Sequence, residues 1–455
     1  MTANVSNITS GFIDIATFDE LEKFMYGGGN AITYFVREVR KSTWFTQIPV
    51  PLSRINGFGT FGSECMFNVS RSGDYLLQAW LRVQLPEVKL SPTNSAGENG
   101  RIRWTKNLMH NLIEEAFVTF NDLQGCRIDN YVLDFWNAFT LSDSKLNGYM
   151  NMIGNKPTLI NPRGPNEKLT SEILSLPLPF FFSRDTGVSL PTAALPYNEI
   201  HIRMKLRKWS ELLIFEDYKK VGNQKLTIVP TTDLMSTPEL VSCHVWANYA
   251  IVSNEERKRM GCSTRDILME NFQTIPQLMF NPKMNPSFDL RLSHSIKVLF
   301  WAVRNTTAVN EWSNYTTASP VVTEKSLIFN PTDSHDPIAS FGLRYENQYR
   351  LADMGSDFFS LVFPYYSAPA IPRDTGYHMY SYSLRFNDLD PKGSTNFGKL
   401  TNVACDIKSS PAAIIASDGQ GEPGADFPQT FQFILVAVNN NIIRISGGAL
   451  GFPVL

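Results

Sequence analysis

Hydrophobic and polar residues alternate along several stretches of this chain. In residues 77–85 every second position is apolar, with Trp80 as the exception. The same period of two occurs in residues 200–207, 288–293 and 380–386. Because successive side chains of a β-strand point to opposite faces, the pattern predicts strands with one buried face. The run 431–438 is apolar on both faces, so we expect a strand that is covered on both sides.

Helical signals are sparse. Thr17–Glu20 and Ser253–Glu256 resemble capping boxes, each opening a short helix, and residues 131–153 are a further candidate. Residues 1–16 show no clear period, and Gly27–Gly29 should end the first helix. We therefore expect an amino-terminal arm with a short helix over residues 1–29, followed by a mainly β body with long excursions between strands.

One tetrapeptide occurs twice: Arg184-Asp185-Thr186-Gly187 and Arg373-Asp374-Thr375-Gly376. Each copy follows an aromatic run and precedes an alternating strand. Upstream, His110 and His294 each open an apolar strand. These matches predict two domains of one topology, offset by about 185–190 residues. The expected boundaries are 30–207 for the first domain, 208–241 for a linker and 242–455 for the second domain.

The repeated tetrapeptides have two possible roles. Asp can bond the following amides and Gly supplies positive φ, so both copies are expected to be equivalent structural turns. The alternative is a ligand site, since Arg and Gly beside Asp could also hold an anion. The histidines are expected to hydrogen-bond at strand ends rather than to bind a metal.

Charge argues against direct contact with a genome. The chain has 41 basic and 43 acidic residues, a net charge of −2. The densest basic run, Glu255–Arg259, is half cancelled by its own glutamates. A protein that coats nucleic acid needs clustered Lys and Arg, so no direct nucleic-acid partner is expected. Without a signal peptide or an apolar run long enough to span a bilayer, a soluble protein made in the cytosol is expected.

The search for chemistry yields no catalytic, cofactor-binding or metal-binding residue. Gly57–Gly62 matches G-x-G-x-x-G, but prolines precede it and residues 64–69 have the pattern of a strand, which favours a loop over a dinucleotide site. The six histidines lie far apart, with no H-x-H pair. Glu114 and Glu115 would point to opposite faces of a strand. Five scattered cysteines indicate buried free thiols, with a late intersubunit bond as the alternative.

Several segments then identify a family. The chain resembles the major capsid proteins of iridoviruses, within the nucleocytoplasmic large DNA viruses, and looks most like those of invertebrate hosts. The resemblance runs from end to end and is strongest in Leu176–Asp185. Other matching segments are Thr9–Asp14, Met25–Gly28, Thr33–Val36, Arg71–Tyr75, Ile102–Trp104, Met109–Leu112, Leu195–Glu199, Ser313–Thr316, Gly393–Gly398, Asn441–Ile443 and Gly451–Leu455.

The resemblance implies an all-β double jelly roll, two eight-stranded β-sandwich barrels with short helices in loops. It also implies a non-enzymatic structural protein whose homotrimers form pseudo-hexagonal capsomers of an icosahedral capsid, assembled in the host cytoplasm. The implied partners are neighbouring capsomers, minor capsid and penton proteins, and internal membrane proteins reached by the arm. Two other readings stay open: a jelly-roll binding module, lectin-like or for receptor attachment, and an enzyme with a carboxylate pair on distant loops.

Overall fold

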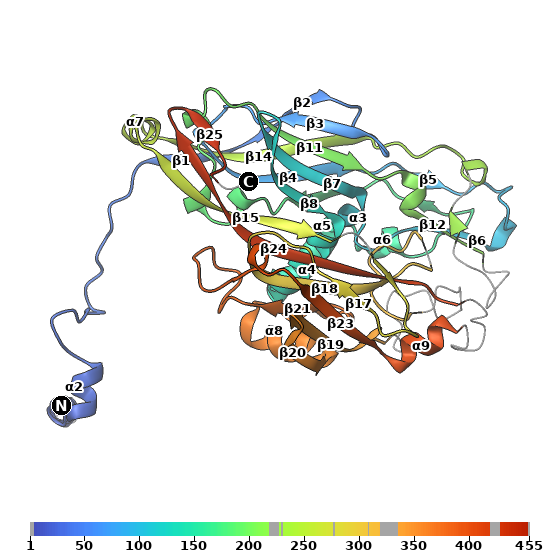
Figure 1. The fold of residues 1–455 in the computed structure, drawn as a ribbon. Helices are drawn as coiled ribbons and strands as arrows, with labels where there is room; N and C mark the ends of the chain where they lie inside the picture. Colours follow the sequence, from blue (N-terminus) through green and yellow to red (C-terminus); the bar gives the residue numbers. More distant parts are fainter. Residues whose placement is uncertain are drawn as a thin grey trace. The chain divides into compact units, whose positions relative to one another are not determined.

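The computed structural model describes residues 4–217, 227–228, 231–275, 278–307, 309–318, 335–418 and 428–453. The chain forms two compact units, Met1–Trp44 and Phe45–Leu455. In the second unit strands predominate and the helices are short (Figure 1). No helix in the described part of the chain combines the length and the apolar character needed to cross a bilayer.

The amino-terminal unit contains two helices, α1 Asn4–Ala16 and α2 Glu20–Met25. The expected capping box at Thr17–Glu20 is wrong by two positions. Thr17 instead closes α1, its amide donating to Ile13 O at 2.9 Å. Asp19 caps α2 in a box with Glu22. The sequence did not indicate helix α1, because β-branched residues, Ser, Asn and Gly make up much of it and all of these are weak helix formers.

The first set of strands in the second unit forms two facing sheets. One has the order β1–β14–β4–β10 and the other the order β2–β3–β11–β7–β8. Their bounds are β1 Phe45–Pro51, β2 Ser53–Asn56, β3 Glu64–Asn68, β4 Tyr75–Gln84, β7 Ile113–Phe120, β8 Leu123–Asp129, β10 Ile173–Pro177, β11 Ile200–Leu206 and β14 Ser242–Val252.

The second set forms two more sheets, of orders β15–β24–β18–β21 and β17–β23–β19–β20. Their bounds are β15 Arg265–Thr274, β17 Ser287–Asp289, β18 Ser295–Asn305, β19 Ile338–Tyr345, β20 Gln348–Gly355, β21 His378–Ser381, β23 Val403–Ser409 and β24 Phe431–Ser446. Short strands β16 Leu278–Phe280, β22 Thr395–Asn396 and β25 Ala449–Gly451 extend the first of these sheets.

Both sets share one topology. The eight main strands are β1, β3, β4, β7, β8, β10, β11 and β14 in the first set, and β15, β17, β18, β19, β20, β21, β23 and β24 in the second. Numbered by position along the chain, each set has one sheet ordered first–eighth–third–sixth and another ordered second–seventh–fourth–fifth. This order is a jelly roll, so the expected double jelly roll is confirmed.

The strand order departs from the boundaries expected within this fold. β14 was expected to open the second domain, yet it is hydrogen-bonded between β1 and β4 of the first jelly roll. Part of the expected linker, β12 Leu213–Asp217, is a fully buried strand paired with β6 Gly100–Trp104. Composition could not reveal these pairings, because each joins strands distant in sequence.

The repeated tetrapeptides do not occupy equivalent places. Arg184–Gly187 follows β10, whereas Arg373–Gly376 precedes β21, and these are the sixth strands of their jelly rolls. His110 likewise precedes the fourth strand, β7, whereas His294 precedes a third strand, β18. The two jelly rolls do share one topology, but the repeated tetrapeptides and the two histidines do not lie at corresponding places in it, so their similarity is coincidental. The family resemblance therefore carried the fold prediction.

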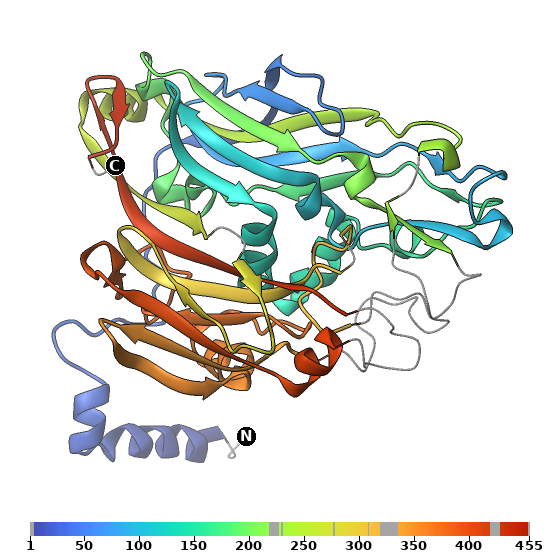
Figure 2. The same ribbon diagram turned by 45° about the vertical axis from the view of Figure 1, so that its right-hand side comes forward.

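The sheet that contains β24 lies between two apolar cores, as the run 431–438 predicted. Ile434, Val436 and Val438 belong to a core shared with the first jelly roll. Phe433, Leu435 and Ala437 belong to the inner core of the second. Helices α3 Leu108–Leu112, α4 Asn130–Thr140 and α5 Asp143–Ile153 lie between the two jelly rolls (Figure 2). The candidate helix 131–153 is thus confirmed as two helices, α4 and α5.

Candidate functional site at the seam of the jelly rolls

The side chain of Asp134, on α4, is a buried hydrogen-bond hub at this seam. Its Oδ1 accepts from Asn107 Nδ2 at 3.1 Å and from His110 Nδ1 at 2.6 Å. Its Oδ2 accepts from Ser313 Oγ at 2.7 Å and from the Tyr315 hydroxyl at 2.8 Å. Two donors come from the first jelly roll and two from the second. The hub therefore ties the jelly rolls together, because a buried carboxylate left unpaired would be costly.

These contacts determine which atoms of the hub carry a proton. Because Asp134 accepts from His110 Nδ1, the other ring nitrogen, Nε2, accepts from the Tyr149 hydroxyl at 2.7 Å. Burial, together with the charge of Asp134, raises the pKa of Tyr149 and of Tyr315 well above the usual value. Both phenols thus stay protonated and act as donors.

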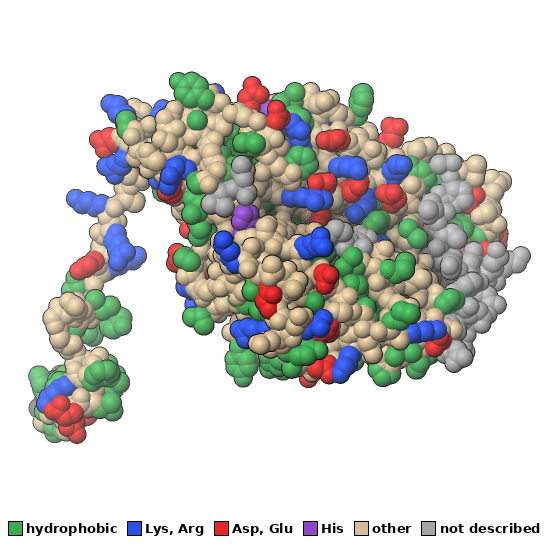
Figure 3. All heavy atoms as spheres, viewed as in Figure 1, with side chains coloured by type: hydrophobic (Ala, Val, Ile, Leu, Met, Phe, Trp, Pro, Cys, Tyr) green, Lys and Arg blue, Asp and Glu red, His purple; other side chains and the backbone are tan. Residues whose placement is uncertain are grey.

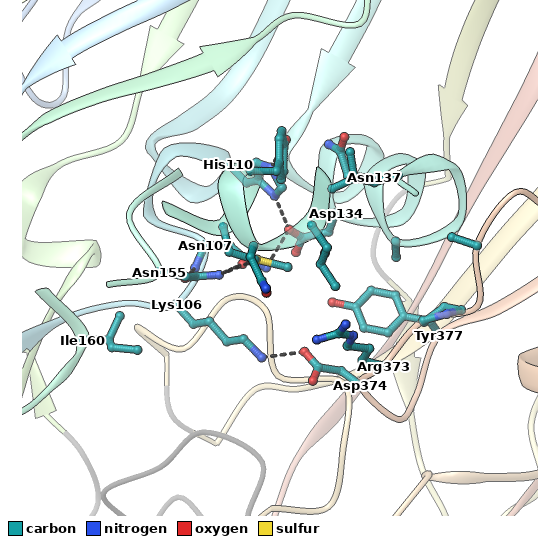
Figure 4. Close-up of a pocket in the computed structure, with 18 of the residues that line it drawn as sticks. Lys106, Asn107, His110, Asp134, Asn137, Asn155, Ile160, Arg373, Asp374 and Tyr377 are labelled. Atoms are coloured by element: carbon teal, nitrogen blue, oxygen red, sulfur yellow. Dashed lines mark hydrogen bonds and ion pairs between the residues drawn. The ribbon is translucent and has the colours of Figure 1, made fainter. Parts of the chain in front are cut away.

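The hub forms one wall of a cavity of about 640 Å³ between α3, α4, α5 and the loop 369–377 (Figure 4). Across the cavity from the hub, Lys106 Nζ donates to Asp374 Oδ2 at 2.5 Å. Arg373 forms an ion pair with Asp143 of α5. The charged side chains of the wall are thus paired across the seam.

Asp134, His110 and Tyr149 are hydrogen-bonded in the carboxylate–histidine–hydroxyl order of a catalytic triad, but the hydroxyl is not an activated nucleophile. Nucleophilic catalysis needs an accessible group whose pKa is lowered toward neutrality. Tyr149 is 8% exposed and its pKa is raised. These hydrogen bonds therefore stabilise the seam between the two jelly rolls.

A second buried charge cluster joins the jelly rolls on the other side of α4. Glu270 of β15 bonds Lys297 Nζ at 2.6 Å, and its Oε2 lies 3.0 Å from Arg184 Nη2. The Arg184 guanidinium stacks on Trp136 of α4, 3.9 Å from the ring centroid. Arg184 therefore does more than form a turn. Sequence reasoning singled out its tetrapeptide but could not find its partners, which lie far along the chain.

The other sequence candidates have structural roles. Gly57–Gly62 is the loop between β2 and β3, and Gly57, Gly59 and Gly62 all have positive φ, as a tight turn requires. Asp185 caps a short 3₁₀ helix by accepting from Gly187 N at 3.3 Å. Among the described residues, no group of three or more His, Cys, Asp or Glu could hold a metal ion.

All five cysteines are free thiols, and the expected burial holds for four of them. Cys65, Cys126, Cys243 and Cys405 are buried, and Cys262 is exposed. Burial raises the pKa of Cys126 to about 12, which keeps that thiol protonated and unreactive.

Comparison with known proteins decides the family. Residues 33–252 match the family model described as "Major capsid protein N-terminus", and residues 256–451 match "Large eukaryotic DNA virus major capsid protein". The chain is 60% identical to the major capsid protein of Tipula iridescent virus, covering 98% of each chain. The chain belongs to the iridovirus major capsid protein family. Further relatives are those of Invertebrate iridescent virus 6, 58% identical with 100% of each chain covered, and of Lymphocystis disease virus 1, 49% identical with 99% of each chain covered.

Solved structures agree with this fold of the major capsid protein family. The chain superimposes on the PBCV-1 virus capsid model with a TM-score of 0.71 at 18% identity, covering 93% of this chain and 100% of that one. For the Faustovirus major capsid protein the TM-score is 0.67 at 13% identity, covering 92% and 93%. Because the chain belongs to the major capsid protein family, it is a structural component of a virion capsid.

Proposed function

We propose that this major capsid protein forms homotrimers that act as pseudo-hexagonal capsomers of an icosahedral capsid. The observation that carries the proposal is the pair of jelly rolls with the same strand order, joined by a seam of buried hydrogen bonds and ion pairs. Three copies around an axis present six similar barrels, a nearly hexagonal block that can tile a flat facet. Around a closed threefold axis the contacts are heterologous, so different surfaces of the chain meet.

Light scattering of the purified protein tests the trimer. We expect a mass near three times 51.3 kDa, because permanent assemblies usually bury more than about 2,000 Å². A monomer that persists at micromolar concentration contradicts the proposal. Formation of ordered sheets or shells by the same preparation separates a capsid subunit from a lectin-like module, which would bind carbohydrate as an isolated trimer.

The amino-terminal arm is proposed to contact minor capsid proteins or membrane-associated proteins on the inner side of the capsid. Its apolar side chains support this: Ile8, Phe12, Ile15 and Phe24 are between 62% and 90% exposed within the described residues. Deletion of residues 1–28 should leave folded trimers but impair particle assembly. Loss of folded protein would show instead that the arm belongs to the body.

We propose no enzymatic activity and no direct contact with nucleic acid. Acidic and basic side chains are interspersed on the visible face of Phe45–Leu455, without a broad basic area (Figure 3). Neither an accessible nucleophile nor a metal-ligand cluster emerges among the described residues of the seam. Binding of genomic DNA at physiological salt would contradict this part of the proposal, as would a hydrolytic activity abolished by removal of a loop carboxylate. Assembly in the host cytoplasm, and contacts with neighbouring capsomers and penton proteins, belong to the same proposal.

We also propose a revised domain division, with the first jelly roll ending near Val252. The pairing of β14 with β1 and β4 supports this boundary, as does the separation of the two family models between residues 252 and 256. Limited proteolysis that cuts near α7, Asn254–Cys262, and leaves two protected fragments would test it. Primary cleavage within β12 would favour the linker at 208–241 instead.

A further inference from the structure

Two buried arginines, one from each jelly roll, meet at a single aromatic ring. Arg207 follows β11 and is 6% exposed, and Arg304 is the last residue but one of β18 and is 4% exposed. Their guanidinium carbons lie 3.8 Å and 4.1 Å from the ring centroid of Trp312. Such contacts stabilise a cation, but they do not neutralise its charge.

The hydrogen-bond acceptors of Arg207 are neutral. Its Nη1 donates to the backbone oxygen of Asn111 at 2.8 Å, and its Nη2 donates to Asn130 Oδ1 at 3.1 Å. Burial lowers the pKa of the Arg207 guanidinium, and the charge of Arg304 lowers it further, while Tyr131, Glu114 and Glu211 act in the opposite direction. The Arg207 guanidinium is thus charged in a place that disfavours charge.

Arg304 is bonded in the same way. Its Nη1 donates to the Tyr131 hydroxyl at 3.1 Å and its Nη2 to the backbone oxygen of Val309 at 3.2 Å, while its buried Nε–H has no acceptor in the described structure. The buried Arg103 differs, since Glu216 and Glu311 both pair with it. Buried charges are normally paired directly, but no carboxylate of the described residues lies at ion-pair distance from Arg207 or Arg304. Glu114 and Glu211 attract Arg207 only from farther away.

Both arginines line a cavity of about 710 Å³ between the ends of β7, β8, β18 and β24. Three carboxylates also line it, but two of them are bonded elsewhere: Glu114 to Lys205, and Asp129 to Thr274 and to the backbone of α4. The third, Glu211, forms no ion pair within the described part of the chain. Thr306 and Gln432 add a hydroxyl and an amide group to the lining of this cavity, which suits a polar ligand rather than an apolar one.

We propose that this cavity binds a phosphate-class oxyanion, either free phosphate or the phosphoryl group of a small metabolite, in contact with Arg207 and Arg304. The planar guanidinium matches a tetrahedral oxyanion through paired N–H donors. Because the arginines come from different jelly rolls, the bound anion ties the two together. The site would therefore couple anion concentration to the rigidity of the capsid subunit.

The test is a titration of the purified full-length protein with inorganic phosphate and, separately, pyrophosphate at constant ionic strength. We expect saturable binding of one anion per chain by equilibrium dialysis, with a melting temperature that rises with the occupied fraction. Stronger binding of pyrophosphate identifies a phosphorylated metabolite as the ligand, and equal or weaker binding identifies free phosphate. The absence of saturable binding of both anions at millimolar concentration overturns the proposal.

Variants assign the binding to these side chains. Arg304→Gln should weaken binding about tenfold or more, the loss expected for a charge-assisted hydrogen bond. Arg304→Lys, which retains the charge, provides the folded protein if the Gln variant fails to fold, and should weaken binding by less. Arg444→Gln is the matched control, because Arg444 is an exposed arginine paired with Asp266. Binding unchanged in both Arg304 variants would place the anion elsewhere.

Discussion

Glu270 and Lys297 form an ion pair across β24, with 2.6 Å between Oε1 and Nζ and each side chain 1% exposed. Glu270 lies on β15 and Lys297 on β18, the two strands that flank β24 in the sheet. The register of β18 against β24 shifts between Ile296 and Val298, so Lys297 is the extra residue of a β-bulge. A bulge re-aims a side chain, and here it brings a lysine to the buried carboxylate at the seam.

Replacing this lysine should destabilise the protein strongly. Lys297→Met leaves Glu270 buried with Arg184 as its remaining cation, and we expect a loss of about 3 kcal/mol in the free energy of unfolding. Chemical denaturation of the purified protein measures it. Arg444→Gln, which breaks an exposed pair with Asp266, should cost less than about 1 kcal/mol. Equal losses in the two variants would mean that burial does not set the strength of the Lys297 pair.

The two repeated arginines should respond differently to the same substitution. Arg184→Lys removes the planar stacking on Trp136 and shifts the charge at Glu270, so the melting temperature should fall by several degrees. Arg373→Lys should leave it nearly unchanged, because Arg373 is 59% exposed and pairs with an exposed Asp143. A similar fall in melting temperature for both variants would mean that the two segments have equivalent roles, and it would contradict this account.

The two repeated glycines offer a second matched pair. Gly376 has φ +97°, and a Cβ there would lie 2.1 Å from the backbone oxygen of Tyr315. Gly187 has no positive φ, and the nearest atom to an added Cβ is Asp185 Oδ2 at 3.1 Å. Gly376→Ala should therefore destabilise by more than about 2 kcal/mol and Gly187→Ala by less than about 1 kcal/mol. Thermal unfolding of the two variants compares them, and the reverse order would contradict this account.

Asp74 should contribute stability that depends on pH. Burial favours a higher pKa for Asp74, but hydrogen bonds from Arg257 and Val252 N, with the charge of Arg257, hold it below its usual value. A lowered pKa adds stability above the unfolded value of about 3.9, and that stability is lost as the pH falls through the folded pKa. Asp74→Asn should therefore be less stable than the wild type at pH 7, with the difference shrinking below about pH 4.

Urea denaturation at a series of pH values measures the effect of Asp74. Asp266→Asn is the control, since the pKa of Asp266 is also lowered, by Arg444, but in an exposed pair. Its effect should be smaller and should diminish with added salt. A difference between Asp74→Asn and wild type that stays constant from neutral to acid pH would contradict the assigned pKa shift.

The sequence by itself determined some of the strands, because alternation with a period of two is a local property that a single chain displays. The alternation in 77–85 and 200–207 corresponds to β4 and β11, whereas the runs 288–293 and 380–386 continue beyond the ends of β17 and β21. The sequence also indicated that β24 is covered on both faces, and the family segments implied the double jelly roll. The local capping geometry was less accessible: Thr17 and Asp19 both suit a helix start, and only the hydrogen bond from Thr17 N to Ile13 O shows which of them ends a helix.

Only the tertiary structure decided how distant segments meet. The sequence marked Met109–Leu112 and Ser313–Thr316 separately, but not that His110 and Ser313 both bond Asp134. Arg184 and Arg373 begin identical tetrapeptides, although Arg184 is buried against Glu270 and Arg373 is exposed. Pairings across more than a hundred residues depend on strand register and on how the two sheets pack, which no local pattern of residues records.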